Sequence, residues 1–568
     1  MTAPVAERGS ARQPGGGIGR AAAVIGLLTV VSGVVGFGRQ LVFAHTVGAS
    51  CVGTAYNTAN QVPNIIYDIV LGGALTSAVV PVLAGPAARA AGTAGAAGPA
   101  EARRIASALL TWALLLLVPA AAIVALVAGP VTTLLIPAAR GCDHAATLAV
   151  SARMLVAFAP QIPLYGIAVV LYGILQAHRR FTAPALAPVV SSIVVAGAYW
   201  GFDVLGHGFQ NRPGALPAGA ELTLALGTTA GVAALAVTAV GPAGRLRLGL
   251  RPALHFPPGV AARVRGLAAV GVITLIAQDL STVAAIVLAN GRGGGGALVL
   301  YGYGWQVFFI VYAGLAVPVA TSAFPVLSER AGQAAGAARA EFDATSAAAT
   351  RAVTLMSWLG AAVLTGACVP LARVFATHDQ AQASQLAVAL ALFAPGLVGY
   401  GLTASLSRAM FAAHRGRATA VAVAGGWLLV IVADVAIVPF VPAAWVVPAL
   451  GLGTTIGLSA AGIALAVAVA RFLGRPALRG VPRAALAGLA GGLAGAAAGA
   501  GVSLALPVRG FVPNAAVTLA SCAAAALVFL AVAALADGGD LRALAGRLLA
   551  RAPWRARVQA PPDAGESR

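Results

Sequence analysis

The chain has 568 residues, of which 60% are hydrophobic and 9% are charged, and its mean hydropathy is +0.90. A water-soluble protein of this length would need more polar surface to cover its core, so the composition indicates a polytopic membrane protein. A formal net charge of +20 would suggest nucleic acid as a partner if the protein were soluble. Here the arginines cluster between apolar segments, where they orient a chain in a bilayer, and we exclude nucleic-acid binding.

Fourteen apolar segments follow one another along the chain, each close to the length of roughly 20 residues that a membrane-spanning helix requires. We expect transmembrane helices over residues 21–44, 60–85, 105–136, 148–175, 185–206, 221–242, 262–290, 298–327, 350–375, 384–411, 418–440, 444–470, 483–506 and 512–536. The predicted fold class is an all-α polytopic membrane protein with 14 transmembrane helices.

Both ends of the chain are more polar than the segments between them. Residues 1–19 are basic and Gly-rich without a cleavage pattern, so we expect the first apolar segment to be a retained helix and not a signal peptide. Residues 537–568 carry arginines on an Ala/Leu-rich background, which is typical of an amphipathic helix on the membrane surface.

Two blocks of sequence occur twice, in the same order. The pattern Phe-Ala-Pro followed by Tyr-Gly occupies Phe158–Gly166 and returns at Phe393–Gly401. In the second block, eight residues recur at one common offset: Tyr56, Gln61, Val62, Ile65, Tyr67, Thr76, Ser77 and Ala78 return as Tyr301, Gln306, Val307, Ile310, Tyr312, Thr321, Ser322 and Ala323. Chance similarity of Ala-rich helices is the alternative, but two blocks in the same order favour two equivalent halves, as in transporters built from internal repeats.

The repeat divides the chain into an N-lobe and a C-lobe. We assign helices 1–6 to the N-lobe, residues 20–255, and helices 7–12 to the C-lobe, residues 256–475. Helices 13 and 14, within residues 476–536, have no counterpart, and residues 1–19 and 537–568 are tails. Because each lobe contains an even number of helices, the two repeats should be parallel to each other.

The arginines predict the orientation of the chain in the membrane. With a cytoplasmic N-terminus, twenty-eight of them fall on the inner side and six on the outer side. The outer six are Arg140, Arg153, Arg212, Arg292, Arg373 and Arg509. This asymmetry predicts that both termini are cytoplasmic.

The four cysteines are Cys51, Cys142, Cys368 and Cys522. They show neither a CxxC pair nor a zinc-site spacing. We therefore predict no metal site and no disulfide framework, and we expect these residues to act as small hydrophobic side chains.

Few charged side chains lie inside the predicted helices. They are Arg39, Asp68, Asp279, Arg408 and Asp434. A charge at the centre of a membrane helix costs at least roughly 2.5–3.5 kcal/mol, so such a residue is expected to face a cavity or a partner. For Arg408, which lies near the predicted inner boundary, we expect the side chain to reach for the interface.

Several stretches resemble the MurJ/MviN family, which belongs to the multidrug/oligosaccharidyl-lipid/polysaccharide (MOP) exporter superfamily. They are Gly36–Arg39, Asn60–Leu83 and Ile174–Phe181 with Pro184 and Pro188, and the most specific motif is Pro63-Asn64 with Gly72, Gly73 and Pro81. The resemblance covers about residues 20–536 and implies fourteen helices in a six-plus-six-plus-two plan. Members flip lipid II, an undecaprenyl-pyrophosphate carrying a disaccharide-pentapeptide, to the outer face of the bacterial plasma membrane for cell-wall synthesis.

An anionic pyrophosphate headgroup requires a cationic, water-accessible cleft, and the planar guanidinium of arginine binds phosphate oxygens in a bidentate manner. Arg39 is the first candidate; an ion pair with Asp68 or an interfacial position are the alternatives. The resemblance adds a departure, because positions where many members carry cavity arginines are Gly33, Tyr67 and Gln306 here, and a frequently acidic position is Thr54. The polar side chains expected to bind the substrate beside Arg39 are Asn57, Asn60, Gln61, Asn64, Tyr67, Asp68 and Gln306.

Transport of a large polar headgroup requires an alternating-access cycle and a driving force. The chain has no GxxxxGK[ST] motif and no cofactor is expected, so the driving force would be Na⁺ or H⁺. Asp434, isolated in the eleventh helix, is the first candidate for the ion site and Asp279 in the seventh is the second. The resemblance implies acidic sodium ligands in these two helices, which Asp434 matches, whereas Asp279 falls about a turn and a half before the expected position. A neutral or locally hydrogen-bonded Asp434 is the alternative.

No paired carboxylates, Ser-His-Asp set or metal cluster is indicated, so we expect a transporter and not an enzyme. Three functions remain open besides lipid II transport. They are transport of another polyprenyl-linked saccharide, ion-coupled drug export, and a non-transporting scaffold for envelope synthesis. The expected partners are the glycolipid, the lipid bilayer and an envelope-synthesis complex.

Overall fold

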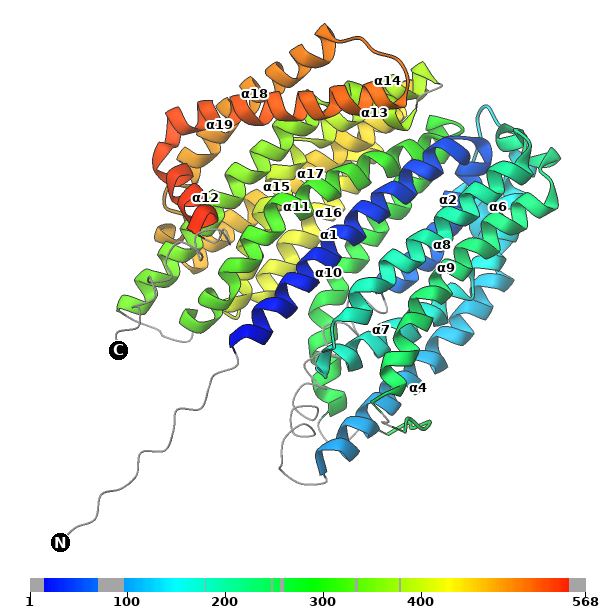
Figure 1. The fold of residues 1–568 in the computed structure, drawn as a ribbon, viewed down its shortest axis with the longest axis horizontal. Coiled ribbons are helices and arrows are strands. Elements are labelled where there is room, and N and C mark those ends of the chain that lie inside the picture. The colour runs from blue at the N-terminus through cyan, green and yellow to red at the C-terminus, as the bar shows by residue number, and fades with distance from the viewer. Residues whose placement is uncertain are drawn as a thin grey trace, which may run out of the picture.

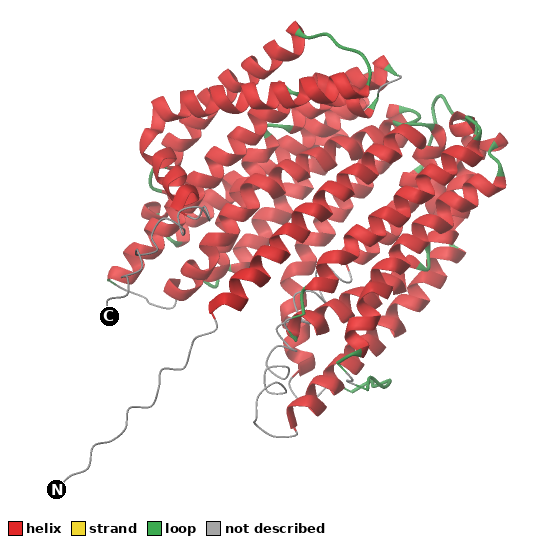
Figure 2. Ribbon diagram, in the orientation of Figure 1, coloured by secondary structure: helices red, strands yellow, loops and turns green. Residues whose placement is uncertain are grey.

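The computed structural model describes residues 15–69, 97–178, 180–246, 249–255, 260–331, 336–376 and 379–550, and within these ranges every regular element is a helix. Long helices run side by side in two groups, with α1 and α10 in the middle of the molecule (Figures 1 and 2). The predicted all-α class is confirmed. The motif residues Gly72, Gly73 and Pro81 lie outside the described residues.

The N-lobe contains α1 (Gly15–Thr46), α2 (Cys51–Tyr67), α4 (Ala97–Leu126), α5 (Ala128–Leu135), α6 (His144–Phe158), α7 (Gln161–Ala177), α8 (Thr182–Gly206) and α9 (Ala218–Gly244). The C-lobe contains α10 (Val260–Leu288), the π-helix η4 (Ala289–Gly293), α11 (Ala297–Ala331), α12 (Ala337–Gly366), α13 (Cys368–Phe375), α14 (Gln380–Phe393), α15 (Gly396–Ala412), α16 (Gly416–Ile437) and α17 (Val446–Phe472). The chain continues with α18 (Val481–Ala505) and α19 (Phe511–Ala550). Short 3₁₀ helices occupy connections, namely η2 (Phe209–Asn211), η3 (Pro213–Ala215), η5 (Val438–Phe440), η6 (Ala443–Trp445) and η7 (Arg475–Leu478).

Among the described residues, eleven helices are long and apolar enough to cross a membrane, or twelve if the pair α14 and α15 forms one bent span. The count of fourteen stays a prediction, as do the residue limits of the lobes. Most helix ends lie within a few residues of the predicted ones. Four predicted helices are each broken in two: residues 105–136, 148–175, 350–375 and 384–411 form α4 and α5, α6 and α7, α12 and α13, and α14 and α15. The largest differences at the outer ends are at α2, which begins at Cys51, at α12, which begins at Ala337, and at α19, which continues without a break to Ala550.

The early start of α12 has a physical reason in its polar first turns. Arg339 pairs with Asp343 one turn later at 3.3 Å, and Glu341 pairs with Arg330 at the end of α11. Such pairs stabilise a helix that extends into water, beyond the apolar segment that hydropathy detects.

The internal repeat is visible in where the helices break. The Phe-Ala-Pro sequence separates α6 from α7 at Ala159–Pro160, and it separates α14 from α15 at Ala394–Pro395. Proline cannot donate the backbone hydrogen bond that would continue the preceding helix, which explains both breaks. In each lobe a preceding long helix is also broken, α4 from α5 and α12 from α13.

The last two helices pack on the C-lobe. α18 and α19 pack against each other, and both contact α12 (Figure 1). The contact is close because glycines face each other: a Cβ at Gly366 of α12 would lie 3.0 Å from the Cα of Gly499 of α18. Small residues at a helix interface allow this approach in membrane proteins.

The two lobes are joined at one end of the molecule. Hydrogen bonds between the lobes lie at the end of the molecule where α1 passes into α2 and α5 passes into α6. Gly295 N donates to Arg140 O at 2.9 Å, and Gly296 N donates to the Thr54 hydroxyl at 2.8 Å. The Gln382 side chain donates to Ala49 O at 3.0 Å. The structure is therefore closed between the lobes at this end.

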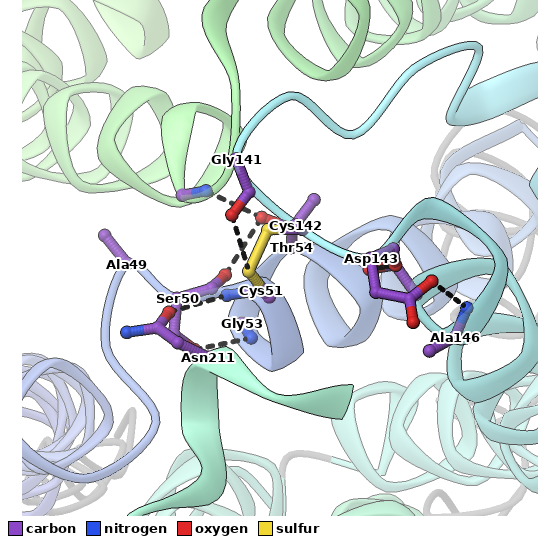
Figure 3. The surroundings of a disulfide bond; sticks show 12 residues. Ala49, Ser50, Cys51, Gly53, Thr54, Gly141, Cys142, Asp143, Ala146 and Asn211 are labelled. Carbon is purple, nitrogen blue, oxygen red and sulfur yellow. Dashed lines mark hydrogen bonds between the residues drawn. A yellow bond between two sulfur atoms is a disulfide. The ribbon is translucent and has the colours of Figure 1, made fainter. Parts of the chain in front are cut away.

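The prediction of no disulfide is wrong. Cys51 and Cys142 form a disulfide with their Cα atoms 5.7 Å apart, joining the start of α2 to the loop before α6 (Figure 3). The sequence separation of 91 residues concealed the pairing, because only folding brings the α1–α2 and α5–α6 connections together. Cys368 and Cys522 are free, as expected.

Candidate functional site

The second helix, α2, places a row of amide side chains on one face. Ser50 caps its N-terminus by accepting a hydrogen bond from Gly53 N, which sets the start of the helix. Asn57, Asn60, Gln61 and Asn64 then follow at helical spacing, so their side chains point in one general direction. Asn57 and Asn64 line two separate cavities, one on each side of α2.

The first cavity, which we call the N-lobe cavity, lies between α1, α2, α7, α8 and α9 and has a volume of about 220 Å³. Of the predicted substrate-binding residues, it brings together Arg39, Asn57, Asn60 and Asn64. No carboxylate lines it, so Arg39 provides its charge. A small polar cavity with one unopposed cation is suited to an anionic group.

Arg39 has no partner within the described chain that would neutralise it. Its Nε is buried without a hydrogen-bond partner, and no ion pair connects it to Asp68, which lies in the second cavity. A buried guanidinium N–H without a partner is costly unless a ligand or water accepts its hydrogen bond. This arrangement favours ligand contact over the ion pair with Asp68.

Tyrosine and threonine hydroxyls form a polar wall of the cavity that Arg39 also lines. The Tyr56 hydroxyl lies 2.9 Å from that of Tyr199 and 3.1 Å from that of Thr228. The Tyr165 hydroxyl donates to Asn64 Oδ1 at 3.1 Å, and the ring of Tyr67 packs against Tyr165 with centroids 4.6 Å apart. Tyr67 therefore supports the wall from behind.

Several lining residues of this cavity were missed by the sequence analysis. They are Tyr165, Ser191, Tyr199 and Thr228, on α7, α8 and α9. The sequences of these helices are largely apolar, and a single hydroxyl group in such a helix does not indicate a binding site. Tyr165 alone had one, because it belongs to the repeated Phe-Ala-Pro block and its counterpart is Tyr400.

The second cavity, which we call the interlobe cavity, lies between α2 and the C-lobe helices α10, α11 and α16 and has a volume of about 140 Å³. Asp68 and Asp279 both line it, together with Gln61 and the aromatic rings of Tyr301 and Trp427. The two carboxylates are close enough to interact electrostatically. The polar face of α2 thus separates a cationic cavity from an acidic one.

The structure does not bring the two predicted ion-site residues into one cavity. Asp434 is 0% exposed at the contact of α16 with α17, and both of its carboxylate oxygens are buried without hydrogen-bond partners. It fits there because residue 453 is glycine: a Cβ at Gly453 would lie 1.9 Å from Asp434 Oδ1. Its electrostatic neighbour is Tyr301, which also lines the interlobe cavity.

Two further predicted residues lie apart from both cavities. Gln306 is half-buried on α11 and lines neither. Arg408 lies within the C-lobe, where it donates to Ala404 O at 2.6 Å and to the Thr321 hydroxyl at 3.1 Å. Over the part of the chain that the structure covers, no group of three His, Cys, Asp or Glu side chains is placed to hold a metal ion.

The fold is similar to solved transporter structures. A lipid II flippase MurJ in an inward closed conformation superposes with a TM-score of 0.67 at 17% identity, covering 90% of this chain and 98% of that one. An inward-facing multidrug resistance MATE family transporter of the MOP superfamily gives 0.57 at 13% identity, covering 78% and 98%. A MOP superfamily transporter from Pyrococcus furiosus, whose binding pocket is described as having reverse polarity, gives 0.53 at 13% identity, covering 80% and 96%.

These likenesses show the fold, and the sequence shows the family. Residues 43–505, well over half of the chain, match the family described as lipid II flippase MurJ. The match includes α2 and every helix of both lobes except most of α1. The chain is a membrane protein that belongs to the MurJ family of lipid II flippases.

Proposed function

We propose that this protein moves lipid II from the inner to the outer face of the plasma membrane by alternating access. Membership of the MurJ family and a MOP-type fold support this function. The observation that carries it for this chain is Arg39, a half-buried residue whose Nε is buried without a partner and which lines a polar cavity without a carboxylate. Such a group can bind the pyrophosphate that joins the sugar to the lipid.

The residues around Arg39 have complementary chemistry. Asn57 and Asn60 carry amide donors and acceptors that match sugar hydroxyls and phosphate oxygens. Asn57 Nδ2 already donates to Gly53 O at 3.1 Å, which leaves its other groups for a ligand. Because Asn57 and Asn64 face both cavities, a headgroup passing between the lobes would stay in contact with α2.

The orientation follows from two independent observations. Positive residues favour the cytoplasmic side, and the arginine count supports a cytoplasmic location of both termini. The disulfide lies at the opposite end, which is consistent with an outer face because disulfides persist in oxidising compartments. The closed contact between the lobes would then seal the outer side, so that the substrate enters from the cytoplasm.

The coupling ion would be Na⁺ or H⁺. Asp434 fits either, because its two buried oxygens lack hydrogen-bond partners and a bound cation or proton would satisfy them. Asp279 lies in the interlobe cavity beside Asp68 and would act separately from Asp434. An envelope-synthesis complex remains a predicted partner.

The test is depletion of the protein in its own host, followed by measurement of lipid II at the outer face of the membrane. Wild type should restore outer-face lipid II, whereas Arg39→Ala should not. Arg212→Ala, which changes an exposed arginine of the same lobe, is the matched control and should restore it. An unchanged amount of outer-face lipid II after depletion would contradict this function. It would favour transport of another polyprenyl-linked saccharide or a role as a scaffold.

A second function, export of a cationic compound, is favoured by one observation. The interlobe cavity contains Asp68 and Asp279 with aromatic rings, a combination that binds organic cations. Asp279→Asn should abolish cation efflux under this function. Loss of lipid II transport in that variant, without any effect on efflux, would remove this alternative.

A further inference from the structure

A third cavity lies away from α2, at the end of the molecule that carries the disulfide. It has a volume of about 580 Å³ and is formed by α13, the start of α14, and the connection from α18 to α19. Arg373, Gln380, Arg509 and Asn514 provide its polar groups. We call it the α13–α19 pocket. Its volume falls in the range of small-molecule sites, about 300–1,000 Å³.

Two cations converge on this pocket without counter-charges. Arg373 and Arg509 belong to the six arginines on the predicted outer side, and neither has a carboxylate partner among the residues that the structure describes. By contrast Arg153, another of the six, is paired with Glu221 at 2.7 Å. Since positive residues are disfavoured on the outer side, two unpaired arginines in one cavity indicate an anionic ligand.

Asp379, next to Gln380 in the chain, is used as a helix cap. Asp379 caps α14 by accepting hydrogen bonds from Ala381 N at 2.9 Å and Gln382 N at 3.0 Å, and it does not line the pocket. The residues that line the pocket thus carry two positive charges and no negative charge.

A buried polar atom also lines the pocket without a partner. Asn514 is 2% exposed; its Nδ2 donates to Gly510 O at 2.7 Å, while its Oδ1 is buried and accepts no hydrogen bond within the described chain. A ligand hydroxyl, a protonated phosphate or a bridging water would satisfy this acceptor. The start of α19 adds partial positive charge at the same place.

The surroundings of the pocket are apolar and exposed, which identifies the ligand as a lipid. Leu504, Leu506 and Val512 flank Arg509 in the chain and are 76%, 49% and 72% exposed. An anion that binds the arginines would therefore have hydrocarbon surface directly beside it. A free phosphate would leave this surface unused, whereas a phospholipid or a polyprenyl phosphate would cover it.

We propose that the α13–α19 pocket binds the phosphate group of an anionic membrane lipid through Arg373 and Arg509. The lipid is either a phospholipid of the surrounding bilayer or a polyprenyl diphosphate. The α13–α19 pocket shares no lining residue with the N-lobe cavity that contains Arg39. Lipid binding in this pocket therefore does not depend on the proposed transport function.

The test is lipid binding to the purified full-length chain, measured by native mass spectrometry with two probes, dioleoyl-phosphatidylglycerol and undecaprenyl diphosphate. Wild type is compared with the double variant Arg373→Gln/Arg509→Gln. The matched control is Arg212→Gln/Arg292→Gln, which removes two exposed arginines at the same end but outside the pocket. Thermal unfolding of each variant verifies that the fold is retained.

We expect the double variant to bind at least one probe about tenfold or more weakly, a loss that corresponds to about 1.4 kcal/mol. The control should bind both probes as wild type does. Preferential binding of phosphatidylglycerol assigns the site to bilayer lipid, and preferential binding of undecaprenyl diphosphate assigns it to the carrier. Equal affinity of wild type and double variant for both probes, or an equal loss in the control, overturns the proposal.

Discussion

Asn290 of η4 donates its side-chain N–H to the hydroxyl of Thr58 on α2 at 2.9 Å, which joins the C-lobe to the N-lobe through a buried hydrogen bond. The same amide donates to Leu135 O at 2.9 Å, and Asn290 is 1% exposed. An alternating-access cycle has to break these bonds when the closed end opens. The bonds therefore bias the molecule toward the closed state described here.

We expect Asn290→Ala to shift the lobes toward the open state at this end. The variant loses two hydrogen bonds, each contributing about 0.5–1.5 kcal/mol. Hydrogen exchange of the backbone over residues 293–300 should accelerate. The control is Asn211→Ala, which removes a hydrogen bond to Cys51 N at the same end but within the N-lobe. Unchanged exchange in Asn290→Ala would show that the bonds do not set this equilibrium.

The Cys51–Cys142 disulfide should stabilise the N-lobe. Because it closes a chain segment of 91 residues, its reduction is expected to lower the stability by about 2–4 kcal/mol. The melting temperature should fall in dithiothreitol for the wild type and for Cys368→Ser/Cys522→Ser, whose two positions are free thiols. In Cys51→Ser/Cys142→Ser, the reductant should have no further effect. An equal melting temperature of the wild type with and without dithiothreitol would contradict this role.

The ion pair between Arg153 and Glu221 should show an asymmetric response to mutation. The pair is bidentate, with both N–O distances at 2.7 Å, but the Arg153 side chain is 59% exposed and that of Glu221 is 11% exposed. Arg153→Ala leaves a buried carboxylate unpaired and should cost about 2–3 kcal/mol. Glu221→Ala leaves an arginine that water can solvate, so the cost should be about 1 kcal/mol or less. Denaturation in detergent measures the loss of stability in both variants. Equal losses would contradict the expected difference in solvation.

If Asp434 binds the coupling ion, two different variants should have the same effect on transport. Asp434→Asn should reduce the Na⁺ or pH dependence of transport in vesicles, because it removes the only buried charge at the α16–α17 contact among the described residues. Gly453→Ala should have the same effect, since its Cβ would displace Asp434 Oδ1. Gly425→Ala is the matched control, because its Cβ would meet no atom within 4 Å. Unaltered ion dependence in Asp434→Asn would exclude this residue.

Helix positions and the repeat were predictable from local pattern. The apolar segments located the described helices of both lobes, because a bilayer requires each to be about 20 residues long and internally hydrogen-bonded. The breaks after α6 and α14 were not predicted, because one continuous helix was expected across each Phe-Ala-Pro sequence. The early start of α12 was not predictable from hydropathy, since Arg339 and Asp343 form a helix turn in polar sequence.

The candidate site was predictable in part, and for a reason that individual residues show. Arg39, Asn57, Asn60 and Asn64 were found because a charge or an amide in an apolar helix is rare and costly, so each is visible in the sequence alone. Tyr199 and Thr228 were missed because a single hydroxyl in an apolar helix has no such cost.

The sequence alone determined that this protein lies in a lipid bilayer. It also determined the positions of the helices, the internal repeat, the family resemblance and the charged residues that need a partner. The tertiary structure alone decided which of those residues meet. It separated Arg39 from Asp68 on opposite sides of α2, kept Asp279 apart from Asp434, and paired Cys51 with Cys142. The physical reason is that helix formation depends on residues a few positions apart, whereas a cavity or a disulfide depends on how distant helices pack.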